Sequence, residues 1–172
     1  LVQFLTAFGN VVGRRPHFKA EADCHFLNLF TAIVGQSSKA RKGTSWGQIR
    51  KLFAIADEPW SKTCQKSGLS SGEGLIWNVR DPIEKKEKGN IVIDDPGVQD
   101  KRLLLIESEL SSVLKILQRE GNTVSAIVRN AWDTGDLQNL VKNSPAKATG
   151  AHISIIGHIT KQELLRYLSE TE

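Results

Sequence analysis

The sequence contains little that would place the protein in a membrane or cross-link it covalently. Its 172 residues include no methionine, one tyrosine and two cysteines. No apolar run approaches the roughly 20 residues that a membrane-spanning helix needs, and no basic segment followed by an apolar run resembles a secretory leader. Cys24 and Cys64 lie far apart and outside any CxxC pair, which argues against a zinc site or a disulfide framework. We therefore expect a cytoplasmic protein with two reduced thiols and no membrane contact.

The chain also lacks internal repeats and low-complexity tracts, and its length predicts a single domain spanning residues 1–172. Because it begins with Leu1 and has no methionine, we expect it to be a piece of a longer protein. Its charge is uneven: residues 1–90 carry 14 Lys and Arg against 8 Asp and Glu, whereas residues 91–172 carry 9 against 11. The basic half would attract nucleotide phosphates or nucleic acid, although a solvated basic face is the plainer alternative.

Short apolar runs alternate with amphipathic segments along the chain. The runs are dense and end at glycine or acidic residues, as buried strands of a parallel sheet do. They occupy residues 26–34, 101–109 and 151–159. The amphipathic segments have apolar residues three and four positions apart, which predicts helices. They occupy residues 46–55, 110–118, 123–132 and 161–168. The alternation predicts an α/β three-layer sandwich with a mainly parallel central sheet.

Two stretches between these elements have other signatures. Residues 81–96 are rich in Lys, Glu, Gly and Pro, and we interpret them as a mobile loop insertion. Residues 137–149 contain two short extended segments around an Asn-Ser-Pro turn, and we interpret them as a hairpin.

The first apolar run is followed by a small, polar and basic loop, GQSSKARKGTS, at residues 35–45. Polyphosphate binding needs free backbone N–H groups, a lysine, a hydroxyl group for magnesium and a helix N-terminus behind them. This loop offers all four, with Lys42 for the outer phosphates and Thr44 or Ser45 as metal ligand and helix N-cap. The candidate phosphate-binding residues are Gly35, Ser38, Lys42, Gly43, Thr44 and Ser45.

The loop departs from the usual P-loop pattern G-x-x-x-x-G-K-[ST]. Gly35 and Lys42 are one residue too far apart, Ala40 or Arg41 occupies the place of the second glycine, and Gly43 follows the lysine instead of preceding it. A basic surface turn between a strand and a helix is therefore the alternative interpretation.

A second motif lies about sixty residues further on, where the apolar run 103–106 ends in Glu107 and Glu109. A parallel strand that ends in acids is typical of a Walker B segment. Its first acid orders the magnesium shell and its second can polarise the attacking water. Glu107 replaces the more usual aspartate, which the chemistry tolerates because both are hard oxygen ligands. We predict Glu107 as a magnesium ligand and both glutamates as catalytic residues.

Other polar residues are weaker candidates. Glu73 lies between two glycines and is either a catalytic glutamate or a helix-start acid that the helix dipole stabilises. His158 and Thr160, at the end of the third run, would sense the terminal phosphate, although a strand histidine is more often a core residue. Arg119 and Arg129 would serve as an arginine finger, reach a nucleic-acid backbone, or simply lie on solvated helix faces.

Five segments together carry a family resemblance: VGQSSKARKGTSW, GLSSGEGLIWNVRDP, DKRLLLIESEL, REGNTVSAIVRNAWDTGDL and ATGAHISIIGHIT. The chain resembles bacterial P-loop ATPases that form the helicase-like part of primase–polymerase proteins from phages, plasmids and integrated elements. The resemblance extends from about Phe8 to the end of the chain.

The resemblance implies a RecA-like or AAA-like P-loop NTPase fold, ATP with Mg²⁺, DNA as a partner, and a homo-oligomer such as a hexamer in the full-length protein. On it, Lys42 and Thr44 match the phosphate-loop positions, Glu107 and Glu109 the Walker B acids, and His158 or Thr160 the sensor. Such proteins continue with another strand and helices, so we expect this chain to be truncated at its C-terminus.

Three functions remain open at this point. The first is an ATP-binding and ATP-hydrolysing domain of a helicase-like protein linked to DNA replication or mobile elements. The second is a non-catalytic DNA-binding or assembly module that keeps the NTPase fold, which the displaced glycine and the truncation favour. The third is a small-molecule kinase, but residues 57–96 show no obvious acceptor pocket.

Overall fold

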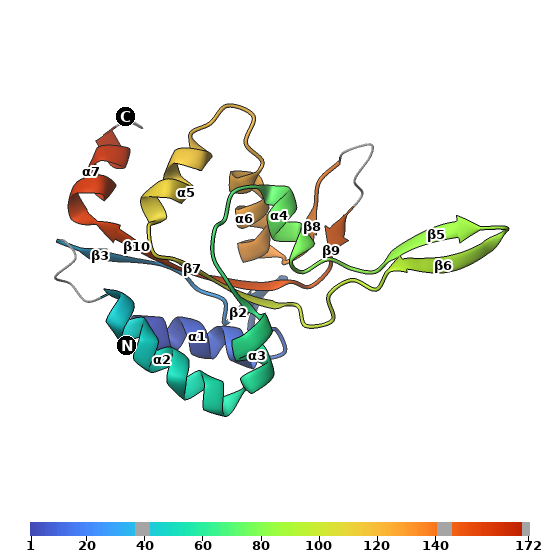
Figure 1. Ribbon diagram of the computed structural model, residues 1–172, viewed down its shortest axis with the longest axis horizontal. Coiled ribbons are helices and arrows are strands. Elements are labelled where there is room, and N and C mark those ends of the chain that lie inside the picture. The colour runs from blue at the N-terminus through green and yellow to red at the C-terminus, as the bar shows by residue number, and fades with distance from the viewer. Residues whose placement is uncertain (37–41, 141–145, 170–172) are drawn as a thin grey trace.

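A parallel four-stranded sheet forms the centre of the computed structural model, which describes residues 1–36, 42–140 and 146–169. The strand order is β3-β10-β7-β4, and each neighbouring pair is parallel. The strands are β3 (Phe30–Gly35), β10 (His152–Thr160), β7 (Arg102–Glu107) and β4 (Gln65–Lys66). Helices cover both faces of the sheet (Figure 1), so the predicted layered α/β architecture with a parallel sheet is confirmed.

The helices divide between the two faces according to their place in the chain (Figure 1). One face carries α1 (Val2–Val12), α2 (Lys42–Ala56) and α3 (Glu58–Thr63). The other face carries α4 (Gly72–Trp77), α5 (Leu110–Leu117), α6 (Val124–Asp133) and α7 (Lys161–Ser169). The predicted helices 110–118, 123–132 and 161–168 are therefore confirmed to within a residue or two at each end.

The core has two halves, because successive side chains of a strand point to opposite faces of a sheet. Leu103 and Leu105 of β7 pack with the buried residues of α4, α5 and α6. Leu104 lies between them in the sequence but packs on the other side, with Trp60 and with Ile156 of β10. Both faces of the inner strands are thus buried, as the dense apolar runs predict.

Three antiparallel hairpins accompany the central sheet. They are β1 (His17–Ala20) with β2 (Asp23–Phe26), β5 (Ile83–Glu87) with β6 (Asn90–Asp95), and β8 (Leu137–Gln138) with β9 (Lys147–Ala148). The third confirms the hairpin predicted at residues 137–149. The β5–β6 hairpin extends well away from the body of the molecule (Figure 1).

The interpretation of residues 81–96 as a loop is wrong, because most of this stretch forms the β5–β6 hairpin. Lys88 and Gly89 have positive φ angles of 48° and 86°, as the two central residues of a tight hairpin turn do. The turn sequence Lys-Gly is a weaker hairpin signal than Asn-Gly. Moreover, the arm buries neither face: the neighbouring residues Ile91 and Val92, which point to opposite faces, are 66% and 39% exposed, so no polar–apolar alternation marks its strands.

The limits of the first predicted strand are also wrong. Residues 26–34 do not form one strand, because Phe26 ends β2 and β3 begins at Phe30. Nor is β3 fully buried: it lies at one edge of the described sheet, and Val34 is 46% exposed. An apolar run of this length is typical of an inner strand, but its composition does not reveal whether neighbours lie on both sides.

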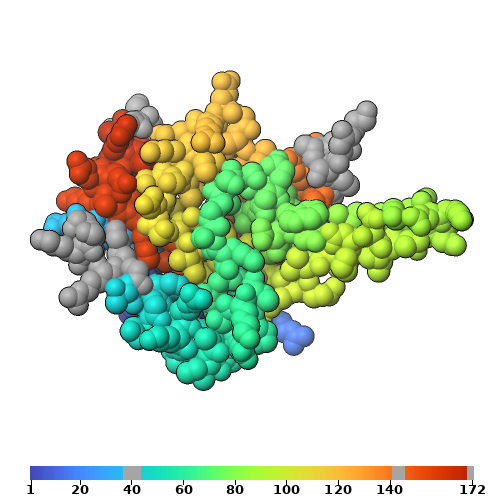
Figure 2. Space-filling view, in the orientation of Figure 1, coloured from blue at the N-terminus to red at the C-terminus, as the bar shows by residue number. Residues whose placement is uncertain are grey.

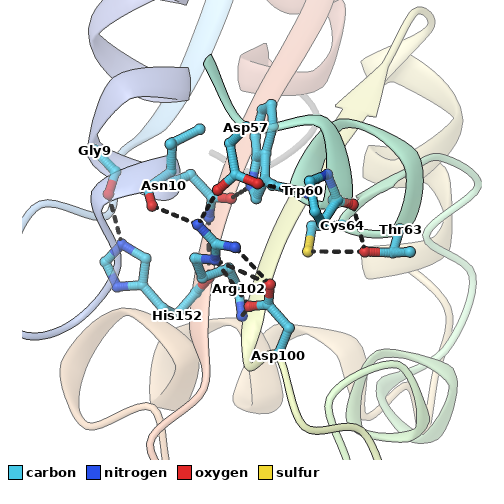
Figure 3. Close-up of polar contacts among 11 residues, drawn as sticks. Gly9, Asn10, Asp57, Trp60, Thr63, Cys64, Asp100, Arg102 and His152 are labelled. Carbon is cyan, nitrogen blue, oxygen red and sulfur yellow. Dashed lines mark hydrogen bonds and ion pairs between the residues drawn. The ribbon is translucent and has the colours of Figure 1, made fainter. Parts of the chain in front are cut away.

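Helix α1 presents polar residues to the sheet and apolar residues to solvent. Gln3, Thr6 and Asn10 are buried, whereas Leu5 and Phe8 are 45% and 46% exposed. The facing side of β10 is itself polar, and it includes His152, Ser154 and His158. Asn10 donates hydrogen bonds to the carbonyl oxygens of Leu103 and His152, each at 3.0 Å. It accepts one from the Trp60 indole at 2.8 Å, so polar pairs join α1 and α3 to the sheet (Figure 3).

An ionic cluster at the amino end of β7 completes this side of the molecule (Figure 3). The Arg102 guanidinium contacts the Asp57 carboxylate at 2.8 Å, the Asp100 carboxylate at 2.6 Å and the Val11 carbonyl oxygen at 2.7 Å. A backbone hydrogen bond from Trp60 lowers the pKa of Asp57, and Arg102 lowers it further. Burial opposes ionisation of Asp100, but hydrogen bonds from Arg102 lower its pKa overall.

Replacing Arg102 with methionine should lower the free energy of unfolding at pH 7 by about 2 kcal/mol, less than for a fully buried pair because the cluster is partly solvated. The pKa values of Asp57 and Asp100 are depressed in the folded protein. Their stabilisation is therefore present above the unfolded value of about 4 and is lost as the pH falls through the folded values. Arg102→Met should flatten this acid limb in urea titrations between about pH 2 and pH 5.

Lys85→Met is the matched control, because Lys85 pairs with Glu87 and Asp94 on the exposed hairpin. It should leave the free energy of unfolding nearly unchanged, because ion pairs exposed at the surface contribute little. An equal loss in both variants, or an unaltered acid limb in Arg102→Met, would contradict the role assigned to the cluster.

Among the described residues, no helix is both long and apolar enough to cross a membrane.

Candidate functional site

The carboxyl ends of the parallel strands meet at one edge of the sheet, and the chain changes faces there. From β3 the chain continues to α2 on one face, whereas β7 leads to α5 and β10 leads to α7 on the other face (Figure 1). Neighbouring β3 and β10 therefore send their connections in opposite directions. Such a topological switch point is where ligands bind in open α/β sheets. The predicted phosphate loop lies at this point, because it joins β3 to α2.

The predicted phosphate-loop residues are only partly described. Gly35 is the last residue of β3 and pairs in register with Thr160 of β10. Ser38 lies outside the described residues, as does the side chain of Lys42, and Gly43 lies in the first turn of α2. Thr44 is exposed in the first turn of α2. The order strand, connection and helix is therefore present, and the connection joins the edge strand to a helix of fifteen residues.

Helix α2 begins at Lys42, so the prediction that Thr44 or Ser45 forms its N-cap is wrong. Both residues lie within the first turn. The first turn contains no acidic residue, so no carboxylate of its own competes for the N–H groups exposed at a helix start. The side chain of Ser45 instead reaches across to α1.

Gln3 of α1 links two of the predicted site residues. The Ser45 hydroxyl donates a hydrogen bond to Gln3 Oε1 at 2.7 Å, and Gln3 Nε2 lies 2.8 Å from His158 Nε2. Gln3 is 6% exposed and His158 is 4% exposed. The start of α2 is thereby connected to the end of β10 through a buried amide. Sequence reasoning missed Gln3, although polar residues at positions 3, 6 and 10 of an otherwise apolar helix are a detectable signal.

Thr160, the other predicted sensor, forms the N-terminal cap of α7. Its hydroxyl lies 2.7 Å from Glu163 Oε2, and the Glu163 N–H in turn lies 3.2 Å from the Thr160 hydroxyl. The Glu163 carboxylate also accepts the Thr160 N–H at 3.1 Å. This reciprocal pattern is a capping box, whose signature Thr-x-x-Glu is legible in the sequence.

Glu107 ends β7 but points away from α2. It follows Leu103 and Leu105 on the face that α4, α5 and α6 cover, and it is 7% exposed. Its Oε1 accepts the Leu69 N–H at 2.9 Å. It borders an apolar cavity of about 220 Å³ beneath α5, together with Leu110 and Val113. The structure therefore places Glu107 and the start of α2 on opposite faces of the sheet.

The other two predicted catalytic acids lie apart from this carboxylate. Glu109 is the exposed residue directly before α5, and its side chain makes no capping hydrogen bond there. Glu73 lies in the first turn of α4, whose N-cap is Ser71. The Glu73 carboxylate contacts the Thr123 hydroxyl at 3.3 Å and the Asn139 amide. These contacts fit its alternative role as a helix-start acid.

The two predicted arginines are exposed on the α5–α6 side of the sheet. Arg119 follows the end of α5, and its backbone N–H bonds to the Ile116 carbonyl oxygen at 3.1 Å. Arg129 lies on α6, where its Nε contacts the Ser125 carbonyl oxygen at 3.4 Å. Both contacts are local, within or next to α5 and α6, and neither joins these arginines to α2.

The described side chains do not form a protein-only metal centre, and the buried thiol of Cys64 is not activated. No cluster of three or more His, Cys, Asp or Glu residues exists within the described ranges. A magnesium ion bound mainly through substrate phosphates would not need one. Burial raises the pKa of the Cys64 thiol to about 11, so this thiol is protonated at neutral pH and is not a nucleophile.

Comparison of the chain with protein-family models and with curated proteins found no match. A functional assignment therefore depends on the residues and the topology at the carboxyl ends of the parallel strands.

Proposed function

We propose that the protein is the ATP-binding domain of a helicase-like P-loop NTPase that acts on DNA in replication or in mobile elements. The β3–α2 connection would hold the triphosphate, with Lys42 on the outer phosphates and the first N–H groups of α2 around them. The observation that carries this proposal is the position of the connection. A small, basic, glycine-containing segment joins a parallel strand to a long helix at the topological switch point of the sheet.

Two further features support the proposal. The start of α2 carries no acidic residue, and Gln3 connects it to His158, at the end of the neighbouring strand β10. A ligand bound at the connection would therefore be coupled to β10 through a buried hydrogen-bonded amide. This is the arrangement that a residue sensing the bound phosphates requires.

The fit differs for the phosphates and for the metal. An anion fits the basic connection and the helix start. The proposed magnesium carboxylate does not fit as well, because Glu107 faces the α4–α6 side and accepts the Leu69 N–H. We therefore derive no hydrolytic step through magnesium from this arrangement.

The orientation of Glu107 favours the second candidate function, a DNA-binding or assembly module that keeps the fold without turning ATP over. In that function Glu107 has a structural role, because its hydrogen bond from the Leu69 N–H holds the segment after β4 against the end of β7. Both candidate functions allow the protein to bind ATP and DNA. They differ in whether Glu107 supports ATP hydrolysis.

Replacing Lys42 with alanine should weaken ATP binding about 10- to 100-fold, which is the effect of losing one charge-assisted hydrogen bond to a phosphate. Isothermal titration calorimetry with ATP, in the presence and absence of Mg²⁺, measures this affinity. Lys51→Ala removes the same charge from an exposed position further along α2 and should bind ATP like the unaltered protein.

Equal affinity of Lys42→Ala and the unaltered chain would rule out the proposed phosphate site. A parallel turnover assay separates the two candidates. Loss of ATPase activity in Glu107→Gln, with binding retained, supports the ATPase. ATP binding without measurable turnover in either protein supports the module.

A further inference from the structure

A polar groove crosses the carboxyl end of the edge strand β4. A cavity of about 590 Å³ lies between α2, α3 and β4. A second cavity of about 200 Å³ lies on the opposite side of this edge, along the segment between β4 and α4, where Leu69 and Leu105 of the other core half line it. Lys66 and Ser67 line both, so the two cavities adjoin. In Figure 2 the segment from α3 through β4 to α4 runs as a green band across the face toward the viewer, with α2 in cyan beside its lower end.

The lining of this groove is cationic and rich in hydrogen-bond donors. Arg50, Lys62 and Lys66 line the larger cavity, and no carboxylate is among the residues described for either cavity. Hydroxyl and amide groups complete the polar surface. They belong to Ser61, Gln65, Ser67, Ser70, Ser71 and Asn78.

The acidic residues close to the groove in the sequence have other partners or are exposed. The Glu73 carboxylate contacts the Thr123 hydroxyl and the Asn139 amide, and Glu107 accepts the Leu69 N–H. Asp57 is bound by Arg102. Glu58 pairs with Lys62 at 2.7 Å, but the two side chains are 68% and 71% exposed, and such an exposed pair contributes little. Lys62 is thus free to exchange this partner for a stronger anion. The groove therefore keeps a net positive charge, in the half of the sequence with the basic excess.

The shape of the groove selects the kind of anion. Together the cavities are longer than one phosphate requires, and the donors are spread along them. The only aromatic residue in the lining is Trp46, which is 9% exposed and so offers no open face on which a base could stack. A ligand read through its repeated charges, and not through its bases, fits this surface.

An acidic peptide fits less well. A peptide that binds beside a sheet edge usually extends the ladder as an additional strand. Here the edge strand β4 has two residues, Gln65 and Lys66, so it offers too short a row of backbone groups for such pairing.

We propose that this groove binds the sugar–phosphate backbone of a single-stranded polynucleotide, with Arg50, Lys62 and Lys66 as the phosphate contacts. The inference rests on the nucleic-acid part of the proposed function and is independent of its nucleotide part. It assigns the contact to the β4 edge and not to Arg119 or Arg129. DNA and RNA share the phosphate chemistry, so the groove itself predicts binding without sequence preference.

The test measures fluorescence anisotropy of labelled 20-mers of dT and of rU with the 172-residue chain, without nucleotide. The variant Arg50→Gln/Lys62→Gln/Lys66→Gln should bind at least tenfold more weakly than the unaltered protein. Three phosphate contacts give an affinity that falls about 20-fold between 50 and 200 mM salt for a single strand, and the variant should lose most of this dependence. A preference for dT or for rU identifies the natural polymer and supports the groove.

The control Lys19→Gln/Lys86→Gln/Lys88→Gln removes three exposed positive charges from the β1–β2 and β5–β6 hairpins. It should bind like the unaltered protein. Thermal melting reports whether each variant folds, and the single variant Lys66→Glu provides a second test if the triple variant does not. Equal weakening in the control, unaltered binding in a folded groove variant, or binding of polyglutamate but no polynucleotide would each overturn the proposal.

Measuring the ATP affinity of the triple groove variant distinguishes the proposed polynucleotide groove from the proposed nucleotide site. The three groove residues lie outside the predicted phosphate loop 35–45, so ATP binding should be unchanged in this variant. Loss of polynucleotide binding with ATP binding retained supports the groove as a separate site. Failure of the unaltered protein to bind any polynucleotide overturns the groove and the DNA part of the proposed function, but leaves the nucleotide site to be judged by Lys42→Ala.

Discussion

Replacing Asn10 with alanine is expected to lower the free energy of unfolding by roughly 4 kcal/mol, more than any other change predicted for this protein. The side chain is fully buried. Its amide nitrogen donates hydrogen bonds to the Leu103 and His152 carbonyl oxygens, and its amide oxygen accepts one from the Trp60 indole N–H. Removing it leaves these buried groups without that partner and opens a cavity beneath α1.

The variant Asn10→Asp separates hydrogen bonding from packing, because its side chain has nearly the same volume. The introduced carboxylate still accepts from Trp60, but it cannot donate to the two carbonyl oxygens. Burial should raise its pKa in the folded state, so the variant should be most stable at low pH and lose stability as the pH rises through that value. Denaturant unfolding at pH 4 and pH 7 measures the difference.

Asn78→Ala is the control for these measurements. The Asn78 amide donates to the Gly74 carbonyl oxygen at 2.8 Å, but the contact is exposed, and its loss should cost less than about 1 kcal/mol. A loss below 1 kcal/mol in Asn10→Ala as well would show that the polar face of α1 does not stabilise the fold in the way proposed.

Replacing Gly9 with alanine should destabilise the protein by about 3 kcal/mol, at the upper end of the usual cost of overpacking. A Cβ atom at this position would lie 2.1 Å from the Leu27 carbonyl oxygen. That atom belongs to the backbone, so it cannot turn aside as the end of a flexible side chain would. Helix α1 would have to move away from the turn before β3, which would disturb the hydrogen bond of 2.9 Å between His152 Nε2 and the Gly9 carbonyl oxygen.

Gly47→Ala provides a control of opposite sign. Gly47 lies inside α2, and a Cβ atom there would meet nothing within 4 Å. Alanine at an open helical position should stabilise the protein by roughly 0.5–1 kcal/mol, because glycine loses more backbone entropy on folding. Thermal melting of both variants gives the comparison. Stabilisation by both substitutions would contradict the close approach of α1 to Leu27.

The sequence predicted element types well where each element has a strong local signature. The helices α5, α6 and α7, the strand β10 and the β8–β9 hairpin all lie close to their predicted limits. It predicted poorly where an element is stabilised by no core of its own. The Lys, Glu, Gly and Pro content of residues 81–96 predicts a loop. In the β5–β6 arm both faces are exposed, and hairpin formation depends on the turn at Lys88 and Gly89.

The candidate site divides in the same way. The position of residues 35–45 between a strand and a helix could be predicted from the sequence, and so could the acidic end of β7. The direction of Glu107 could not, because alternation along a strand shows which residues share a face but not which helices cover that face. The Gln3 bridge to Ser45 and His158 joins residues 42 and 155 positions away from Gln3. The polar positions of α1 indicate a buried polar contact but do not identify its partners.

The sequence by itself determined the α/β class, the alternation of the larger strands with helices, and the basic connection that follows β3. Local composition and periodicity carry this information, because the spacing of apolar residues along an element shows which of its faces is buried. Only the tertiary structure decided that α1 turns its polar residues inward, that Glu107 and α2 occupy opposite faces, and that Arg50, Lys62 and Lys66 line one groove. Each of these arrangements depends on the residues of the element packed opposite. A polar side chain can be buried wherever that element supplies its hydrogen-bond partners.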